Sequence, residues 1–233
     1  MYSPELKTIA QQESLPITIL RLDVTSDDSV AQAFRQLVSE RSHIDVLINN
    51  AGIATFGGVE DLPLEVFRQT METNYFGALR CIKAVLPSMR ERRSGCIVNV
   101  SSVGDRMAVA AHASYDASKF AIEALSEVLA QELKTFNVRV AIVEPRIIQT
   151  SIFEKLPEDP PDSRYPHEGR LRALHAASLR NPVSPFLVAE AIRQVVESDG
   201  WQLRYPVGPD AVPLLQQRFR NPWKGAARKP LNL

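Results

Sequence analysis

The sequence predicts an α/β fold built on a parallel sheet that helices cover on both faces. Short apolar runs rich in β-branched residues alternate with longer segments whose apolar residues recur at helical spacing. These short runs are almost continuously apolar, which is typical of strands buried on both faces. The chain has 233 residues, and we expect residues 1–233 to form one domain of this kind.

Five short runs are the candidate strands. They are rich in Val, Ile and Leu, and polar or turn-forming residues bound them. In chain order they are residues 17–22, 44–48, 96–100, 138–143 and 201–207.

Two helical segments are expected in the first half of the chain. One begins after Thr25 or Ser26, since either hydroxyl can cap a helix whose first turn holds two aspartates. The other occupies residues 63–92, and we expect it to bend or break near Pro87 because proline removes a helical hydrogen bond.

The second half of the chain is expected to add two further helices. Residues 115–136 are rich in Ala, Leu and Glu, with Leu125, Val128 and Leu129 as the expected buried stripe. A second helix begins at Ser184-Pro185. Between these helices, residues 151–183 are irregular and are expected to form a lid over the substrate. Residues 215–233 form a basic tail.

Composition excludes several classes of partner. Lys plus Arg and Asp plus Glu each number 27, and this balance removes the electrostatic case for nucleic acid as a partner. No apolar run reaches the roughly 18 residues of a membrane span. The two cysteines, Cys81 and Cys96, lie in apolar stretches, which favours a reducing, cytoplasmic setting. The histidines lack metal-ligand spacing, so no metal site is expected.

Tyr115 and Lys119 form a candidate acid/base pair. Four residues apart on a helix, both side chains project from one face, with Cβ atoms roughly 5–6 Å apart. A phenol is a poor acid or base at neutral pH, and a nearby ammonium lowers its pKa by stabilising the phenolate. A Tyr and a Lys at this spacing also occur by chance, when a tyrosine simply packs under the lysine stem. The neighbouring residues therefore decide between a catalytic pair and a structural one.

The context places two more polar residues near this pair. Ser102 closes the strand that precedes the helix, and sites in parallel sheets form where strands end. Asn74 lies inside an expected helix, although asparagine is a poor helix former, which indicates a role beyond propensity.

Together these motifs resemble the short-chain dehydrogenase/reductase family over residues 17–150. Asn74, Ser102, Tyr115 and Lys119 match its catalytic tetrad. Three further segments match its cofactor-binding motifs: Asp23-Val24 matches the pair that contacts adenine; Asn49, Ala51 and Gly52 match the NNAG turn; and Pro145 with Ile148 and Thr150 matches the PGxxxT segment. In the family, Tyr115 and Lys119 would also contact the nicotinamide ribose. Within the family, the chain is most similar to the branch of 17β-hydroxysteroid and retinol dehydrogenases.

The resemblance implies a Rossmann-like, doubly wound sheet and an oxidoreductase that uses NAD or NADP. Tyr115 would exchange a proton with the substrate oxygen, Ser102 would donate a hydrogen bond to it, and Lys119 would lower the pKa of the phenol. Asn74 would hold a water that joins Lys119 to solvent. The substrate would be a small alcohol or ketone, and we expect it to be apolar. Members of the family usually associate as dimers or tetramers.

Two departures from the family pattern stand out. The family begins with a strand and a glycine-rich turn that binds the diphosphate, yet the first glycine here is Gly52. We therefore expect a sheet that lacks the first βαβ unit, with a gap or a new pairing between residues 17–22 and 44–48, and weak cofactor binding. Arg146 replaces a usual glycine, either contacting a phosphate or lying on the surface. The alternative function is a non-catalytic homologue that acts through protein association.

Overall fold

The computed structural model describes residues 4–103, 108–148, 150, 152, 165, 167–178, 180, 183–209 and 211. Within helices, the side chains of residues 4, 5, 168, 171, 174, 175 and 178 lie outside this description. The expected tail at 215–233 and most of the expected lid at 151–183 also lie outside it.

Four parallel strands form one sheet in the order β1 (Val46–Asn49), β2 (Gly95–Val100), β3 (Val138–Pro145) and β4 (Arg204–Val207). The register pairs Leu47 with Ile97 and Ile97 with Val140. Strands that are adjacent in the sheet are also consecutive in sequence, so a crossover connects each pair. The predicted α/β class with a parallel sheet is confirmed.

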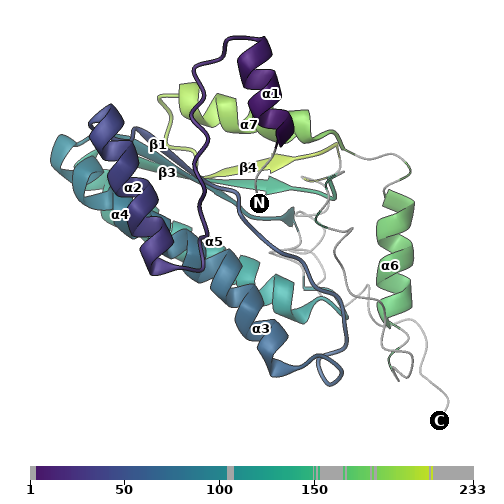
Figure 1. The fold of residues 1–233 in the computed structure, drawn as a ribbon. Coiled ribbons are helices and arrows are strands. Elements are labelled where there is room, and N and C mark those ends of the chain that lie inside the picture. Colours follow the sequence, from purple (N-terminus) through teal and green to yellow (C-terminus); the bar gives the residue numbers. More distant parts are fainter. Residues whose placement is uncertain are drawn as a thin grey trace.

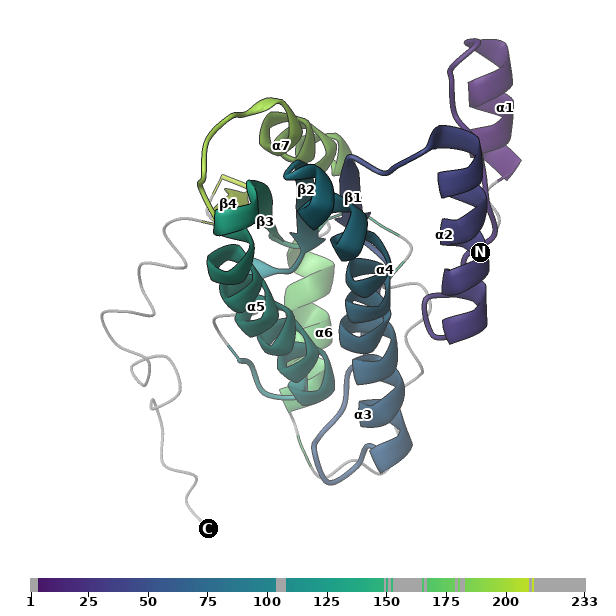
Figure 2. The same ribbon diagram turned by 90° about the vertical axis from the view of Figure 1, so that its left-hand side faces the viewer.

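Helices cover both faces of the sheet, as Figures 1 and 2 show. On one face lie α4 (Gly77–Arg92) and α5 (Ala113–Leu133), and on the other lies α7 (Pro185–Glu197). α2 (Asp27–Arg41) packs against α4. α1 (Pro4–Gln12) and α6 (His167–Ser178) stand away from the sheet. Three short helices complete the described elements: α3 (Leu64–Met71), η1 (Glu72–Phe76) and η3 (Lys134–Phe136).

Alternate residues of the central strands fill two separate cores. Ile97 and Val140 pack with Ile82 of α4 and Leu129 of α5, whereas Val98 packs with α7 on the opposite face. Because successive side chains of a strand point to opposite faces, an unbroken apolar run supplies both cores at once.

The predicted strand at residues 17–22 is wrong. This segment is extended but belongs to no ladder, and Ile17 and Leu22 are 44% and 39% exposed. Among the described residues, β1 pairs with β2 alone, so neither side of the segment meets a strand. β-branched composition favours extended backbone, but a strand also requires a neighbour to accept its hydrogen bonds. The alternative expectation of a new pairing with β1 is therefore also not met.

The long helical stretch at 63–92 is interrupted at a different place from the one predicted. α4 continues through Pro87, whereas residues 72–76 form a π-helical segment that contains Asn74. Such segments insert a wider turn into an α-helix and frequently occur at functional sites.

The buried stripe of α5 agrees with the prediction at Leu125 and Leu129, which pack in and against the core, but not at Val128. Leu129 is buried, but Val128 is 50% exposed. The buried positions Ile122, Ser126, Leu129 and Leu133 follow one another at three- and four-residue steps, and Val128 lies about 100° from Leu129 around the helix.

The predicted helix starts at Ser26 and Ser184 are confirmed. The Ser26 hydroxyl accepts a hydrogen bond from the backbone N–H of Ser29, and that of Ser184 accepts one from Phe186. No helix in the described part of the chain is both long and apolar enough to cross a membrane. The same residues hold no group of three or more side chains that could bind a metal ion.

Candidate active site

A cavity of about 440 Å³ lies where β1, β2 and β3 end. The loops that follow these strands form its floor, and the first turns of α5 and one side of α7 form its walls. Its polar or charged lining residues are Asn50, Ser101, Ser102, His112, Tyr115, Lys119, Arg146 and Thr150. This is the edge of a parallel sheet at which polar side chains from several strands converge.

Tyr115 and Lys119 occupy the first turns of α5 and both face this cavity. The Nζ atom of Lys119 lies 5.6 Å from the centroid of the Tyr115 ring. Nζ also donates a hydrogen bond of 2.9 Å to the carbonyl oxygen of Val100, the last residue of β2. Lys119 is only 7% exposed, so its charge is poorly screened by solvent and favours the phenolate form of Tyr115.

Ser102 shares the cavity with this pair. It is half-buried in the loop that follows β2, and its neighbour Ser101 is 4% exposed. The Ser101 hydroxyl has no hydrogen-bond partner among the described residues. The structure thus brings Ser102, Tyr115 and Lys119 to one cavity, as the sequence predicts.

Asn74 lies behind the cavity wall rather than in it. Its Oδ1 accepts a hydrogen bond from the Ile53 N–H at 2.8 Å, and its Nδ2 donates to the Ile53 carbonyl at 3.0 Å and to the Ser118 hydroxyl at 2.9 Å. Asn74 therefore ties the loop after β1 to α5, through residues that directly neighbour Gly52 and Lys119 in sequence. Its role as the holder of a water stays a prediction.

Gly52 gives the cavity part of its width. A Cβ atom at this position would lie 3.3 Å from Asn74 Oδ1 and 3.9 Å from Lys119 Nζ. A side chain here would therefore crowd the polar groups that surround the site. Three more residues predicted for the site line the same cavity: Pro145, the last residue of β3, and Ile148 and Thr150 in the segment after it.

Asn49 and Ala51 do not line the cavity, although the sequence assigns both to cofactor binding. Asn49 Nδ2 donates a hydrogen bond of 2.8 Å to Asn99 Oδ1, and Asn99 Nδ2 donates one of 2.7 Å to Ser126. The Asn49 side chain thus joins β1 to β2 and α5, and the next residue, Asn50, faces the cavity instead.

Asp23 and Val24 lie apart from the cavity. The Asp23 carboxylate accepts hydrogen bonds from the backbone N–H and the hydroxyl of Thr25, and these bonds lower the pKa of Asp23. Val24 packs close to Gly77, where an added Cβ would approach Val24 Cγ2 to 2.7 Å. Both residues shape the start of α2 and its contact with α4.

Asn50, Arg146 and His112 line the cavity as well, although the sequence did not assign them to the site. Asn50 could have been found from strand alternation, because it follows an inward-facing Asn49. Arg146 is half-buried and lines the cavity, so the surface alternative for it is wrong. His112 is only 7% exposed, although it lies in a loop before α5. No local sequence signal distinguishes a buried loop histidine from an exposed one.

A second cavity of about 520 Å³ shares five lining residues with the first. The shared residues are Asn50, Gly52, Ala54, Thr150 and Ile152. The second cavity then extends to Leu62, just before α3, and to Val66 on α3. The two cavities together form an elongated space, which suits more than one small ligand.

Comparison with known proteins places these features in context. Residues 3–161 match a family model described as short chain dehydrogenase. Retinol dehydrogenase 8 of Bos taurus is 37% identical over 216 residues, which cover 88% of this chain and 69% of that protein.

Solved structures show the same fold. A short-chain dehydrogenase from Streptomyces avermitilis is 33% identical, with a TM-score of 0.82 over 93% of this chain and 79% of that chain. An alcohol dehydrogenase from Thermococcus sibiricus complexed with 5-hydroxy-NADP is 22% identical, with a TM-score of 0.70 over 86% of this chain and 77% of that one. The second likeness concerns the fold alone.

Proposed function

The chain belongs to the short-chain dehydrogenase/reductase family, in the branch similar to retinol dehydrogenases, and is therefore an oxidoreductase. From this premise we propose that it interconverts an alcohol and a ketone or aldehyde, with NAD or NADP as cofactor. The observation that carries the proposal is the convergence of Ser102, Tyr115 and Lys119 on one cavity, with the lysine ammonium 5.6 Å from the tyrosine ring.

Each of these residues has a distinct task in the proposed reaction. Tyr115 takes the proton from the alcohol oxygen in oxidation and returns it in reduction. Ser102 donates a hydrogen bond to the same oxygen as negative charge develops there. The Lys119 ammonium lowers the pKa of the phenol, so that Tyr115 can act as a base near neutral pH.

The cavity fits a nicotinamide cofactor. Gly52 leaves room that a Cβ would fill, and the lining carries the cations Lys119 and Arg146 but no carboxylate among the described residues. In our proposal Gly52, Pro145, Ile148, Thr150, Tyr115 and Lys119 hold the cofactor, and Arg146 contacts a phosphate. When bound, the cofactor would supply or accept the hydride.

We propose an apolar substrate. The wall opposite Tyr115 and Lys119 is aliphatic, with Ile152, Val188 and Ile192 among its residues. Retinol, which the related bovine enzyme is named for, is an alcohol of this class. An aliphatic wall contributes binding energy through burial, and the few polar groups orient the reacting oxygen.

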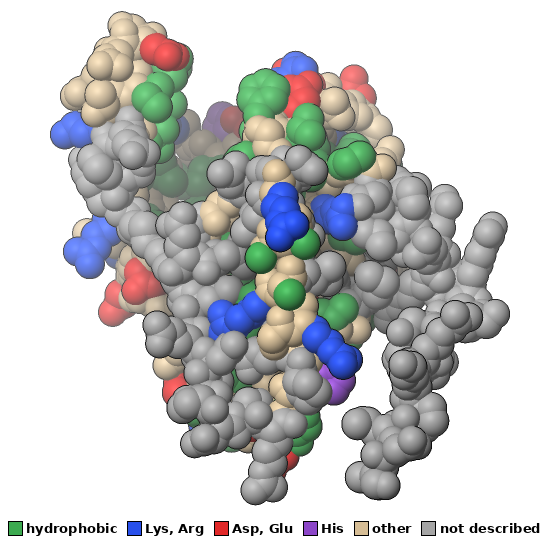
Figure 3. All heavy atoms as spheres, turned by 90° about the vertical axis from the view of Figure 1, so that its right-hand side faces the viewer, with side chains coloured by type: hydrophobic (Ala, Val, Ile, Leu, Met, Phe, Trp, Pro, Cys, Tyr) green, Lys and Arg blue, Asp and Glu red, His purple; other side chains and the backbone are tan. Residues whose placement is uncertain are grey.

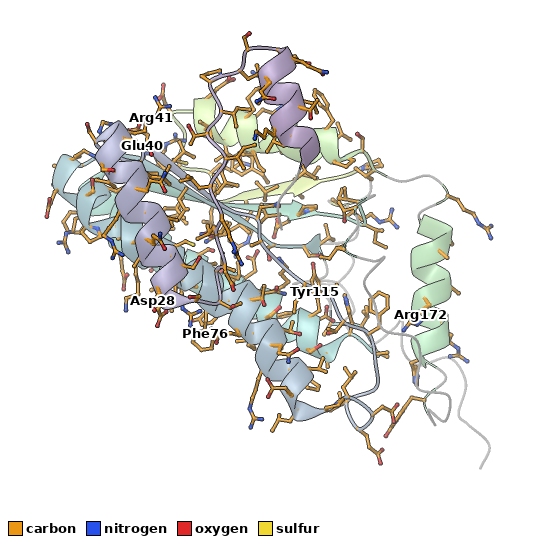
Figure 4. The ribbon with its side chains drawn as sticks, viewed as in Figure 1. Asp28, Glu40, Arg41, Phe76, Tyr115 and Arg172 are labelled. Atoms are coloured by element: carbon orange, nitrogen blue, oxygen red, sulfur yellow. The ribbon has the colours of Figure 1, made fainter. Side chains whose placement is uncertain are left out.

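We also propose that the protein associates through α4 and α5 as a homodimer or homotetramer in the cytoplasm. Phe76, the last residue of η1 directly before α4 and labelled in Figure 4, is 43% exposed, and Val128 of α5 is 50% exposed. Apolar surface of this kind is stabilised by contact with a second subunit. The free thiols of Cys81 and Cys96 are buried, and burial raises their pKa, which agrees with a reducing compartment.

Turnover with cofactor in excess tests the catalytic proposal. The purified protein is assayed with NADH and with NADPH at millimolar concentration against a panel of apolar ketones and aldehydes. We expect cofactor oxidation that Tyr115→Phe reduces by about 10² to 10⁴-fold. Saturable cofactor binding without turnover would favour the non-catalytic alternative. A Tyr115→Phe rate within about threefold of the wild-type rate would refute the catalytic assignment of Tyr115.

A further inference from the structure

His112 is built into the wall of the cavity next to Tyr115. Its ring stacks on the Tyr115 ring, with centroids 4.6 Å apart and an interplanar angle of 21°. Its Nδ1 lies 2.9 Å from Asp116 Oδ1, and the two side chains are 9% and 3% exposed. The buried His112 imidazole thus contacts both the proposed catalytic phenol of Tyr115 and the buried carboxylate of Asp116, the residue after Tyr115.

Asp116 also braces the turn that carries His112. Its Oδ2 accepts a hydrogen bond of 2.9 Å from the Val109 N–H. The His112 N–H in turn donates to the Val109 carbonyl at 3.3 Å. One carboxylate therefore holds both the backbone of the turn and the imidazole ring.

The backbone before His112 adopts a conformation that L-residues rarely use. Ala111 has φ +66°, in the left-handed region, where a Cβ atom is disfavoured. Its carbonyl accepts a hydrogen bond of 2.9 Å from the Gly57 N–H, which anchors the turn to the loop after β1. A strained alanine is retained only where surrounding contacts determine the conformation, and here that conformation directs His112 toward Tyr115.

The imidazole also contacts a second aromatic ring. The Phe56 ring meets it edge-on, with centroids 5.1 Å apart at 60°. The Arg172 guanidinium carbon lies 5.6 Å from the centroid of the Phe56 ring. Figure 4 shows Arg172 extending from α6 toward the region where Tyr115 lies at the start of α5, and Figure 3 shows Lys and Arg side chains along and beside α6. A continuous stack thus runs from α6 to the phenol.

We infer that His112 is a positioning residue for Tyr115, and that Asp116 orients it. This inference rests on the function proposed above. The stacked imidazole fixes the plane of the phenol ring, and so it fixes where the Tyr115 hydroxyl lies relative to the substrate oxygen. Misplacement of a reacting group by about 1 Å can lower a rate by about 100-fold. Asp116 Oδ1 lies 2.9 Å from His112 Nδ1, so the carboxylate charge favours the ring orientation that turns Nδ1 toward it.

Two double variants isolate the contribution of the ring. H112F/D116N keeps a flat ring beside Tyr115, and H112A/D116N removes it. Both lack the Asp116 charge, so neither leaves a buried carboxylate without its imidazole partner. The amide that replaces the carboxylate can still accept from the Val109 N–H. The two proteins differ only at position 112. Urea unfolding of both measures how much the residue at this position changes the stability of the fold.

Kinetics provide the first measurement. We expect kcat of H112A/D116N to fall about 10- to 100-fold below that of H112F/D116N, with the KM for the ketone within about threefold. The control is His43→Ala, which breaks another His–Asp pair, with 3.2 Å between His43 Nε2 and Asp45 Oδ1 at the surface, and should leave kcat unchanged. Equal kcat values for the two double variants would overturn the inference.

The second measurement needs no turnover. In protein labelled with ¹³C in its tyrosine rings, the Tyr115 signal is assigned by its loss in Tyr115→Phe. We expect this signal to shift in H112A/D116N, because the ring current of the stacked neighbour is lost, and to shift less in H112F/D116N. An unchanged Tyr115 signal in all variants would overturn the positioning role. If wild-type turnover is absent but the signal shifts as expected, the proposed function fails while the positioning geometry stands.

The single variant Asp116→Asn covers the case in which a double variant does not fold. It keeps the imidazole and an acceptor for the Val109 N–H but removes the charge that orients the ring. We expect a measurable shift of the Tyr115 signal and a fall in kcat of about three- to tenfold. A protein with wild-type kcat and an unchanged Tyr115 signal would contradict the orienting role of Asp116.

Discussion

Replacing Asn74 with alanine tests how the site is held in place. Asn74 is 3% exposed and makes three hydrogen bonds, two with the backbone of Ile53 and one with Ser118. Asn74→Ala removes all three and leaves the Ile53 N–H and carbonyl without these partners. At a net 0.5–1.5 kcal/mol for each bond, the expected loss of unfolding free energy is about 1.5–4.5 kcal/mol.

The assay is equilibrium unfolding in urea, with the free energy taken from the midpoint and slope. The control is Gln36→Ala, which removes an exposed amide that makes one 2.9 Å hydrogen bond to Glu40 on the surface of α2. It should change the free energy by less than about 0.5 kcal/mol. A loss for Asn74→Ala as small as that of the control would refute the reasoning, because the loop after β1 would then be held by other contacts.

Three other perturbations have clear expected outcomes. Gly77→Ala should destabilise the fold by about 1–3 kcal/mol, because the new methyl group would lie 2.7 Å from Val24 Cγ2. Gly169→Ala has nothing within 4 Å of the new methyl group and should stabilise α6 by up to about 1 kcal/mol. Thermal unfolding of the two variants measures both effects. Lys119→Ala should weaken cofactor binding and move the acid limb of the pH–rate profile for alcohol oxidation to higher pH, because the pKa of the neighbouring phenol rises; an unchanged profile would leave only the binding role. The pKa of Asp23 is lowered in the fold, so the ionised carboxylate stabilises the protein above its ordinary pKa, and this stabilisation is lost as pH falls through the folded pKa. Asp23→Asn should therefore weaken the dependence of Tm on pH at acid pH. An unaltered acid slope of Tm would contradict this.

Local sequence patterns predicted the position of a residue correctly where a single helix or strand determines that position. Tyr115 and Lys119 face the same way because a helix places residues four apart on one side, whatever surrounds it. Ser102 follows a buried strand, and strand ends in a parallel sheet share one edge. The caps at Ser26 and Ser184 depend on a hydroxyl and on the backbone three or fewer residues away.

Local sequence patterns did not predict the structure where the outcome depends on a segment that is distant in sequence. Residues 17–22 have the composition of a strand, but no ladder forms because hydrogen-bond partners come from another part of the chain. Asn49 was assigned to the cofactor, yet it bonds to Asn99, fifty residues away, and Asn50 takes the cavity position. Which of two adjacent residues faces a ligand depends on the faces that the neighbouring elements cover.

By itself the sequence determined the α/β class, the family and the residues that carry the proposed chemistry, because these follow from periodicity and from motifs of fixed spacing. Only the tertiary structure decided that His112 is buried against Tyr115, that Asp116 holds it, and that Asn74 braces the loop after β1. Asn74, in a π-helical turn, bonds to residues 21 and 44 positions away. His112 is close to Tyr115 and Asp116 in sequence, but it follows a left-handed alanine and packs against Phe56 of a distant loop. Local propensity does not predict such contacts, since the surroundings that maintain them come from other parts of the chain.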